Sequence, residues 1–393
     1  MASTKKKILF VNGHLNVGGI EKSLADLLKN LDDDIYDIDL LLLEDKGTYI
    51  ERLPKSVHVL YRDPSHVYGP LFKTFWNNLL HRRWGDIAFR LILFLAPKLG
   101  EWILKALRPV LGLTSEYDCA IAYRVGKPNE IVSRVVKAKK KVCWWHNGEC
   151  NYSPHQVQHI RSLWKNIDTI VAVSNGCKEM IVDRFGVDEK KVSVIPNIID
   201  VDSIQRLAGE VSPYTDNAKV RIVTLGRLCW EKHIEDVPEI ARHLIEQDHH
   251  DFKWYIIGDG AKHNEIEAKI KNDHLEEHVF MLGRIDNPYP YLKFADMMVH
   301  TSYVEAHCLT LLEAMSLMTP CVATKTNLPQ DFTEDGVNCL LAEQSIESQT
   351  ASTARMISQL DEVSVMVRNA FEMVCERYSA EAIIPQVGAI FKS

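Results

Sequence analysis

Short apolar runs alternate with helical patterns along most of this 393-residue chain. This alternation is typical of a parallel sheet that helices cover on both faces. In the first half, strands are expected at residues 7–12, 37–43, 119–123, 141–145 and 169–173, and helices at 20–31 and 177–185. A chain of this length exceeds one ordinary core, so we expect two or more domains.

A polar stretch, residues 209–220 (GEVSPYTDNAKV), interrupts the pattern and is typical of a linker. The pattern then starts again, with strands expected at 220–225, 254–257, 279–282, 297–300 and 321–324, and helices at 235–247, 264–272 and 309–317. The predicted fold class is therefore α/β, with two doubly wound, Rossmann-like domains. A ligand is expected between them, at the carboxyl ends of both sheets.

Composition narrows the class of protein. The net charge of −7 argues against a general nucleic-acid binder, which needs a basic surface to displace counterions. The nine cysteines form no C-x-x-C pair, so we interpret them as reduced thiols of a cytosolic protein, in preference to a disulfide framework or a zinc site. The start MASTKKKILFV is basic, but its apolar run is short, which favours a first strand over a signal peptide.

The segment 69–113 differs from its surroundings. It contains seven Lys or Arg against Asp86 and Glu101, and it is rich in Leu, Trp and Phe. It has no uncharged run long enough to span a bilayer. Basic amphipathic helices often lie on anionic membrane surfaces. Composition alone leaves open whether this insertion contacts a membrane or only packs on the first domain.

Two features of the first half follow predicted strands. Gly18-Gly19 lies between the first strand and a helix, where glycine amides and a helix N-terminus favour an anion. A plain strand-to-helix turn is the alternative. His146, in VCWWHNGE, is expected to face the ligand, with a structural histidine as the alternative.

Two cations follow the first strand of the second half. Arg227 comes directly after Gly226, and Lys232 precedes a helix. An Arg fork and a Lys point charge suit a diphosphate. The alternative is two solvated loop cations.

Two carboxylates stand eight residues apart in YVEAHCLTLLEAM. Glu305 lies in a predicted loop, and Glu313 lies in an apolar helix. Thr310 and Glu313 fit the S/T-x-x-E capping box, so a helix cap is one interpretation of Glu313. The other is a contact to a ligand, because amides at this helix start would face the same ligand.

Two Asp-x-Asp pairs, Asp37/Asp39 and Asp200/Asp202, have the spacing of a magnesium site. The first pair flanks a strand start and the second lies in a predicted loop. We expect no metal at either.

The order of the motifs is more specific than any one of them. Gly18-Gly19 is followed by IPNIID, GRLCWEK, IIGDG, FMLGRID, SYVEAHCLTLLEAM, TPCVAT and EDGVNCLL. This succession resembles glycosyltransferase family 4, which has the GT-B fold of two Rossmann-like domains facing a central cleft. The resemblance covers nearly the whole chain and is most specific at residues 222–341. Residues 60–115 do not match a general family pattern.

The resemblance implies domains at 1–210 and 211–375, for acceptor and nucleotide sugar respectively, with a C-terminal helix at 376–393 returning to the first domain. It also implies a retaining hexosyltransferase-type enzyme that takes a UDP- or GDP-sugar and needs no bound metal. Arg227 and Lys232 would neutralise the donor diphosphate. Glu305 and His146 would lie near the donor sugar, and Glu313 would hold the ribose. The other implied donor-binding residues are Gly18, Gly19, Gly258, Gly260, His307, Cys308, Leu309 and Thr310.

Several positions depart from the family pattern. Ala306, His307 and Cys308 follow the first glutamate, where glycine commonly comes next. His233, Met318 and Asn327 also stand where glycine or small residues are common. The sugar pocket is therefore expected to be unusual.

The family often builds polysaccharides on lipid carriers. Together with the basic insertion, this suggests a peripheral enzyme on the inner face of the cell membrane that extends a lipid-linked glycan for a cell-surface polysaccharide or glycoconjugate. The alternatives are a GT-B sugar-nucleotide epimerase and a non-catalytic sugar-binding protein. An NAD-dependent dehydrogenase is disfavoured because G-x-G-x-x-G is absent.

Overall fold

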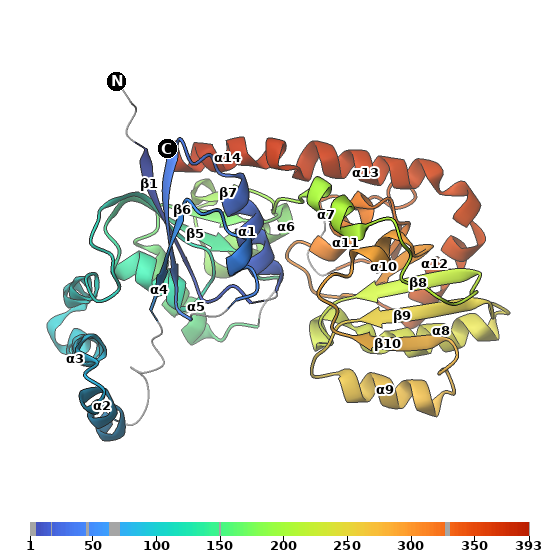
Figure 1. Cartoon of the computed structure of the whole chain (residues 1–393), viewed down its shortest axis with the longest axis horizontal. Coiled ribbons are helices and arrows are strands. Elements are labelled where there is room, and N and C mark those ends of the chain that lie inside the picture. The colour runs from blue at the N-terminus through green and yellow to red at the C-terminus, as the bar shows by residue number, and fades with distance from the viewer. Residues whose placement is uncertain are drawn as a thin grey trace.

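A computed structural model describes residues 5–16, 18–44, 47–62, 71–148, 151–326 and 331–392. Two parallel sheets, each covered by helices, follow one another along the chain (Figure 1). This confirms the predicted α/β class with two doubly wound domains. Cys150 and Asn327 lie outside the described residues.

The first sheet has seven parallel strands in the order β3-β2-β1-β4-β5-β6-β7. Its strands are β1 (Lys6–Asn12), β2 (Tyr36–Leu42), β3 (Val57–Tyr61), β4 (Tyr117–Ala122), β5 (Ala138–Trp145), β6 (Thr169–Ala172) and β7 (Val192–Val194). Its helices are α1 (Gly19–Asn30), α2 (Leu71–Leu80), α3 (Trp84–Leu99), α4 (Lys127–Arg134), α5 (Pro154–Trp164) and α6 (Asn175–Phe185), with 3₁₀ turns η1 (Ile50–Arg52), η3 (Glu101–Leu107) and η4 (Glu189–Lys191). β3 and β7 were not predicted.

The second sheet has six parallel strands in the order β10-β9-β8-β11-β12-β13. They are β8 (Val220–Leu225), β9 (Phe252–Ile257), β10 (Val279–Gly283), β11 (Met297–His300), β12 (Cys321–Thr324) and β13 (Leu340–Ala342). The helices of this half are α7 (Val201–Ala208), α8 (Val237–Glu246), α9 (His263–Asn272), α10 (Tyr289–Lys293), α11 (Leu309–Ser316), α12 (Ile346–Ser358) and α13 (Ser364–Tyr378), with 3₁₀ turns η5 (Trp230–Lys232), η6 (Ile234–Asp236) and η7 (Leu360–Glu362).

The central strands of both sheets are buried on both faces, and their sequences are therefore continuous apolar runs. In β1, Ile8, Leu9, Phe10 and Val11 have no exposed surface. In β11, all four residues are buried. The edge strands β3, β7 and β13 are only three to five residues long and partly exposed, which explains why sequence patterning missed them.

The last helix returns to the first domain. α14 (Ala380–Lys392) lies over the first sheet, and α13 lies over the second (Figure 1). The ring of Phe391 packs edge-on against Tyr36 at 5.3 Å and against Phe10 at 6.2 Å between centroids. The chain thus crosses between its two halves twice, before α7 and after α13.

The basic insertion forms α2, α3 and η3 at the edge of the first domain, away from the second (Figure 1). Phe89, Leu104 and Leu107 anchor it in the first core. Its outer surface carries exposed aromatic and aliphatic side chains, namely Trp76, Leu80, Trp84, Leu91, Phe94 and Trp102. In the part of the chain that the structure describes, no helix combines the length and apolarity needed to cross a membrane.

Candidate active site

The loop after β11 lies against the first domain. The Ser174 hydroxyl, at the start of α6, donates a hydrogen bond of 2.8 Å to the carbonyl of Ala306. A side chain at Gly148, in the loop after β5, would place its first carbon 3.1 Å from the carbonyl carbon of Glu305. The carboxyl ends of the two sheets therefore meet around residues 305–308, as predicted for a ligand site.

Lys232 and Glu305 form the central ion pair of this region. The Lys232 ammonium lies 2.5 Å from Glu305 Oε1, and both side chains are largely buried. Burial disfavours the charge on Lys232, but the carboxylate outweighs it and raises the pKa of Lys232. Burial would likewise raise the pKa of Glu305, yet Lys232 and His300 hold it well below its usual range. Lys232 is thus not a solvated loop cation.

His300, the last residue of β11, is a site residue that sequence analysis missed. Its Nε2 lies 3.1 Å from Glu305 Oε1 and 2.9 Å from Cys308 Sγ. Burial opposes its positive charge, but Cys308 and Glu305 outweigh burial and raise the pKa of His300 to about 9. The available signal was its place at the carboxyl end of a buried strand, five residues before Glu305.

Glu313 pairs with a lysine from the other domain. Lys22 Nζ, in α1, lies 3.1 Å from Glu313 Oε1, and the Tyr289 hydroxyl donates to the same oxygen at 3.3 Å. The capping interpretation of Glu313 is wrong, since α11 begins at Leu309 with Cys308 as N-cap and no side-chain cap bond. Leu309 and Thr310 occupy the first turn of α11.

The Gly18-Gly19 turn lies close to α11. A side chain at Gly19 would place its first carbon 3.4 Å from Leu309 Cδ1. At Gly18 the carboxylate of Glu21 occupies that space at 2.3 Å, and Glu21 accepts a 2.9 Å hydrogen bond from Arg124. The turn is therefore compact and meets the helix that carries Glu313.

His307 faces the domain interface. Its Nδ1 lies 3.3 Å from Asn197 Nδ2, and Asn197 accepts a hydrogen bond from Ser23. The His307 Nε2 and the His146 Nε2 are buried with no hydrogen-bond partner among the described residues. Burial lowers the pKa of His307 to about 4 and that of His146 to about 3, so both rings stay neutral near pH 7. The His146 ring lies parallel to Trp144, with centroids 6.3 Å apart, and is tilted by 46° against Tyr123 at 4.5 Å.

Gly258 and Gly260 permit close backbone contacts. A side chain at Gly258 would place its first carbon 1.8 Å from the Gly226 carbonyl oxygen, and one at Gly260 would lie 2.5 Å from the Leu228 carbonyl oxygen. These contacts fix the loop that carries Arg227. Arg227 itself is exposed, and no carboxylate within the described ranges pairs with it.

Two departures from the family pattern adopt backbone conformations that favour glycine. His233 has φ of 47° and Met318 has φ of 58°. The His233 ring stacks on Tyr303 with centroids 3.6 Å apart. Larger residues are therefore accommodated at both positions, at a cost in backbone strain.

The Asp-x-Asp pairs have structural contacts. Asp200 caps α7 through the amide of Ser203 and pairs with Lys29 at 2.6 Å. Asp39 accepts a 2.7 Å hydrogen bond from Tyr117. Neither pair is among the metal-competent groups found in the described residues.

The fold and site define a two-domain GT-B protein. The sequence pattern of the Glycosyl transferases group 1 family matches residues 213–373, and that of Glycosyltransferase Family 4 matches residues 133–203. The structure of HepE of Anabaena in complex with UDP is similar, with a TM-score of 0.70, 19% identity and 98% and 99% of the two chains covered. The chain belongs to the family 4 glycosyltransferases of the GT-B type.

Two curated relatives illustrate the range of similarity. An uncharacterized glycosyltransferase of Methanocaldococcus jannaschii is 25% identical over 56% of this chain and 57% of its own. A diphospho-undecaprenol 4-alpha-N-acetylgalactosaminyltransferase of Campylobacter jejuni, whose acceptor carries N-acetylgalactosamine and N,N'-diacetylbacillosamine, is 30% identical over 46% of this chain and 48% of its own. The matched regions span about half the length of these relatives.

Proposed function

We propose that the protein transfers a sugar, with retention of anomeric configuration, from a UDP- or GDP-sugar to a glycan acceptor on a lipid carrier. The observation that carries this proposal is the buried Lys232–Glu305 ion pair at the carboxyl end of the second sheet, where the first domain meets it. A buried lysine with a single carboxylate partner offers a cation to a second anion. A donor diphosphate is such an anion.

Lys232 and the exposed Arg227 serve the leaving group in this proposal. The bond from the sugar to the diphosphate breaks with negative charge developing on the phosphate oxygens. Fixed cations in a site that excludes water stabilise that charge more than water does. The chain's own residues then suffice for the leaving group, so turnover is expected without a divalent metal ion.

Glu305 is better placed to orient the sugar than to attack it. Its carboxylate is ionised and is held by Lys232 and His300, which limits it as a free nucleophile. A double displacement would need a second carboxylate close to the reacting carbon. Same-face transfer, in which the leaving group and the acceptor share one side of the sugar, is the retaining route that fits Glu305 in an orienting role.

The ion pair between Glu313 and Lys22 leads us to expect that the two domains change their contact when the donor binds. If Glu313 holds the ribose hydroxyls, the donor must compete with Lys22 for the same carboxylate oxygen. Lys22 keeps Asp26 as a second partner at 3.0 Å, so it is not left unpaired when the donor takes Glu313. Donor binding would then loosen one contact between the domains.

The insertion of α2, α3 and η3 supports a membrane-bound acceptor. It exposes Trp76, Trp84 and Trp102, and it carries Arg82 and Arg83 just before Trp84. Aromatic and basic side chains together suit the interface of an anionic membrane. The Campylobacter relative is named for an undecaprenol-linked acceptor, which agrees with a lipid carrier here. The proposed location is the inner face of the cell membrane.

Turnover of a donor panel tests the proposed function. The chain is incubated with UDP- and GDP-sugars, with and without a diphospho-polyprenol glycan and with EDTA present. Nucleotide release that requires the acceptor, with a product that keeps the donor's anomeric configuration by NMR, is the expected result. An altered donor sugar without acceptor would indicate the epimerase. Binding without turnover would indicate a sugar-binding protein, and an inverted product would contradict retention.

A further inference from the structure

One ring nitrogen in the site has more partners than it can serve. His300 Nε2 lies 2.9 Å from Cys308 Sγ, 3.0 Å from Ser302 Oγ and 3.1 Å from Glu305 Oε1. All four residues are buried. An imidazole nitrogen carries either one hydrogen or one lone pair, so it makes one good hydrogen bond at a time. Nε2 can therefore make a good hydrogen bond with only one of these three atoms, although the Ser302 hydroxyl and the Cys308 thiol carry hydrogens of their own.

We propose that this cluster binds a thiophilic divalent cation of the Zn²⁺ class. His300 Nε2, Glu305 Oε1 and Cys308 Sγ all lie within 4.8 Å of one another. Imidazole, carboxylate and thiolate are the ligands that Zn²⁺ takes, in three-ligand sites that leave the fourth position open. Ser302 or a water would complete the four. The cysteine spacing predicts no structural zinc site, and this site needs only one thiol.

The distances require a small expansion of the cluster. Bond lengths of about 2.0–2.3 Å around a tetrahedral ion place neighbouring ligand atoms roughly 3.3–3.8 Å apart. The observed separations of 2.9 Å and 3.1 Å are therefore short by roughly 0.2–0.9 Å. Side-chain rotation at Cys308, at the N-cap of α11, provides this without moving β11.

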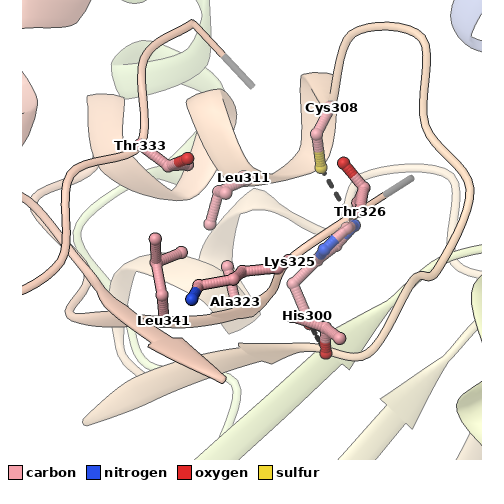
Figure 2. Close-up of a pocket in the computed structure, with 9 residues that line it drawn as sticks. His300, Cys308, Leu311, Ala323, Lys325, Thr326, Thr333 and Leu341 are labelled. Atoms are coloured by element: carbon pink, nitrogen blue, oxygen red, sulfur yellow. Dashed lines mark hydrogen bonds between the residues drawn. The ribbon is translucent and has the colours of Figure 1, made fainter. Parts of the chain in front are cut away.

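A cavity gives the cation a way in. A space of about 280 Å³ borders both His300 and Cys308 and continues between β12, β13 and α11. Figure 2 shows the Cys308 sulfur directed at the imidazole of His300, with Lys325 and Thr326 from the loop after β12 beside it. Two of the three ligands thus line the cavity, which is large enough for a hydrated ion to enter.

The cation would compete with Lys232. Glu305 Oε1 is the atom that both the metal and the Lys232 ammonium would use. Binding of the metal ion therefore separates Lys232 from Glu305 and places the charge of the metal beside the Lys232 ammonium. Zn²⁺ is then expected to inhibit transfer. This last step rests on the proposed function, whereas binding of the cation does not.

Cobalt substitution tests the site in the full chain. Metal-free protein is titrated with Co²⁺, which reports a thiolate ligand by a charge-transfer band in the near ultraviolet. We expect one equivalent with this band, displaced by Zn²⁺. Cys308→Ser is expected to abolish the band and to weaken Zn²⁺ binding about 100-fold or more, since even outer-shell changes cost 10- to 100-fold. Cys375→Ser, in α13, is the matched control and should behave as the unaltered chain.

No band in the unaltered chain, or a band that persists in Cys308→Ser, would overturn the proposal. X-ray absorption of the Zn²⁺-loaded unaltered chain provides a measurement that needs no variant. One sulfur ligand is expected, and its absence refutes the site. A chain that binds Co²⁺ through Cys308 but transfers no sugar keeps this site and fails the proposed function. A chain that transfers sugar but shows no Co²⁺ charge-transfer band refutes this site and keeps the proposed function.

Discussion

The ammonium of Lys22, in the first domain, lies 3.1 Å from the carboxylate of Glu313, in the second. Both side chains are largely buried, with 14% and 7% of their surface exposed. Removing one partner of a buried pair leaves the other charge uncompensated, which costs about 3–5 kcal/mol. The pair therefore contributes to how the two domains are held together, in addition to any contact that Glu313 makes with a ligand.

Variants of this pair separate the structural role from the ligand role. Lys22→Met and Glu313→Gln should each lower the free energy of unfolding, and the double variant should lose about 1–3 kcal/mol less than the sum of the two. Glu313→Gln should also weaken nucleotide binding by roughly tenfold if one hydrogen-bonded charge is lost. Lys22→Met should not, because it releases Glu313. Equal weakening in both single variants would show that Glu313 acts only through the ion pair.

Met318 ends α11 in a conformation that suits glycine. Thr319 donates to Ala314 and Met318 donates to Met315, both at 3.1 Å, which is the Schellman pattern with Met318 at C′. Its φ is 58° and its side chain is 47% exposed. Met318→Gly should therefore raise the free energy of unfolding by about 1 kcal/mol, measured by urea denaturation. Leu317→Gly, one residue earlier with φ of −99°, should destabilise the chain instead.

The neutral, buried His307 predicts a loss of stability in acid. Burial lowers its folded pKa to about 4, whereas the unfolded pKa is about 6.5. Between these values the unfolded chain binds a proton that the folded chain does not, so stability falls as pH drops from about 6.5 to about 4, by on the order of 1 kcal/mol per pH unit.

His307→Asn should flatten that slope, measured as the free energy of unfolding across the same pH range. His250→Asn, at an exposed position, should leave the slope unchanged. If both variants keep the slope of the unaltered chain, His307 does not resist protonation in the fold. His146, whose folded pKa is about 3, contributes a slope of its own that continues to lower pH, so the His307 variant should keep that part of the slope.

The insertion should bind anionic vesicles. Flotation with phosphatidylglycerol-rich liposomes is expected to recover the chain at low salt and to lose it at high salt. Each basic residue near such a surface contributes about 1 kcal/mol, so Arg82→Glu with Arg83→Glu should weaken recovery strongly. Lys271→Glu with Arg284→Glu, on the second domain, applies the same charge change elsewhere and should have little effect. Salt-insensitive recovery, or equal loss in both pairs, would count against this surface.

Much of the fold was predictable because its central strands are buried on both faces. The patterns at 297–300 and 321–324 match β11 and β12 to the residue. The edge strands β3, β7 and β13 were missed because three to five partly exposed residues are too few to form a clear pattern. The same periodicity also placed α11 with its start at Leu309, but the predicted capping box of Thr310 and Glu313 is wrong, because Cys308 is the N-cap and makes no side-chain cap bond.

The structure places several predicted site residues together, but it surrounds them with partners that were not predicted. Motif order singled out Lys232, Glu305 and Glu313, whose roles remain predictions. The partner Lys22 was missed because it lies in the other domain, and only the fold brings it within 3.1 Å of Glu313. His300 was missed although its place at the end of a buried strand, five residues before Glu305, was an available signal. An ion pair between two domains, such as Lys22 with Glu313, leaves no recognisable spacing pattern in a single sequence.

Arg227 provides the most direct test of the central claim, that the chain binds a nucleotide diphosphate at the second sheet. It is exposed and has no carboxylate partner in the described part of the chain, so its removal should leave the melting temperature unchanged. The measurement is calorimetric titration of UDP and GDP into the unaltered chain, Arg227→Ala and the control Arg284→Ala. We predict that one nucleotide binds the unaltered chain and the control alike, and binds Arg227→Ala at least about tenfold more weakly. Binding of neither nucleotide, or equal binding to all three chains, would contradict the account.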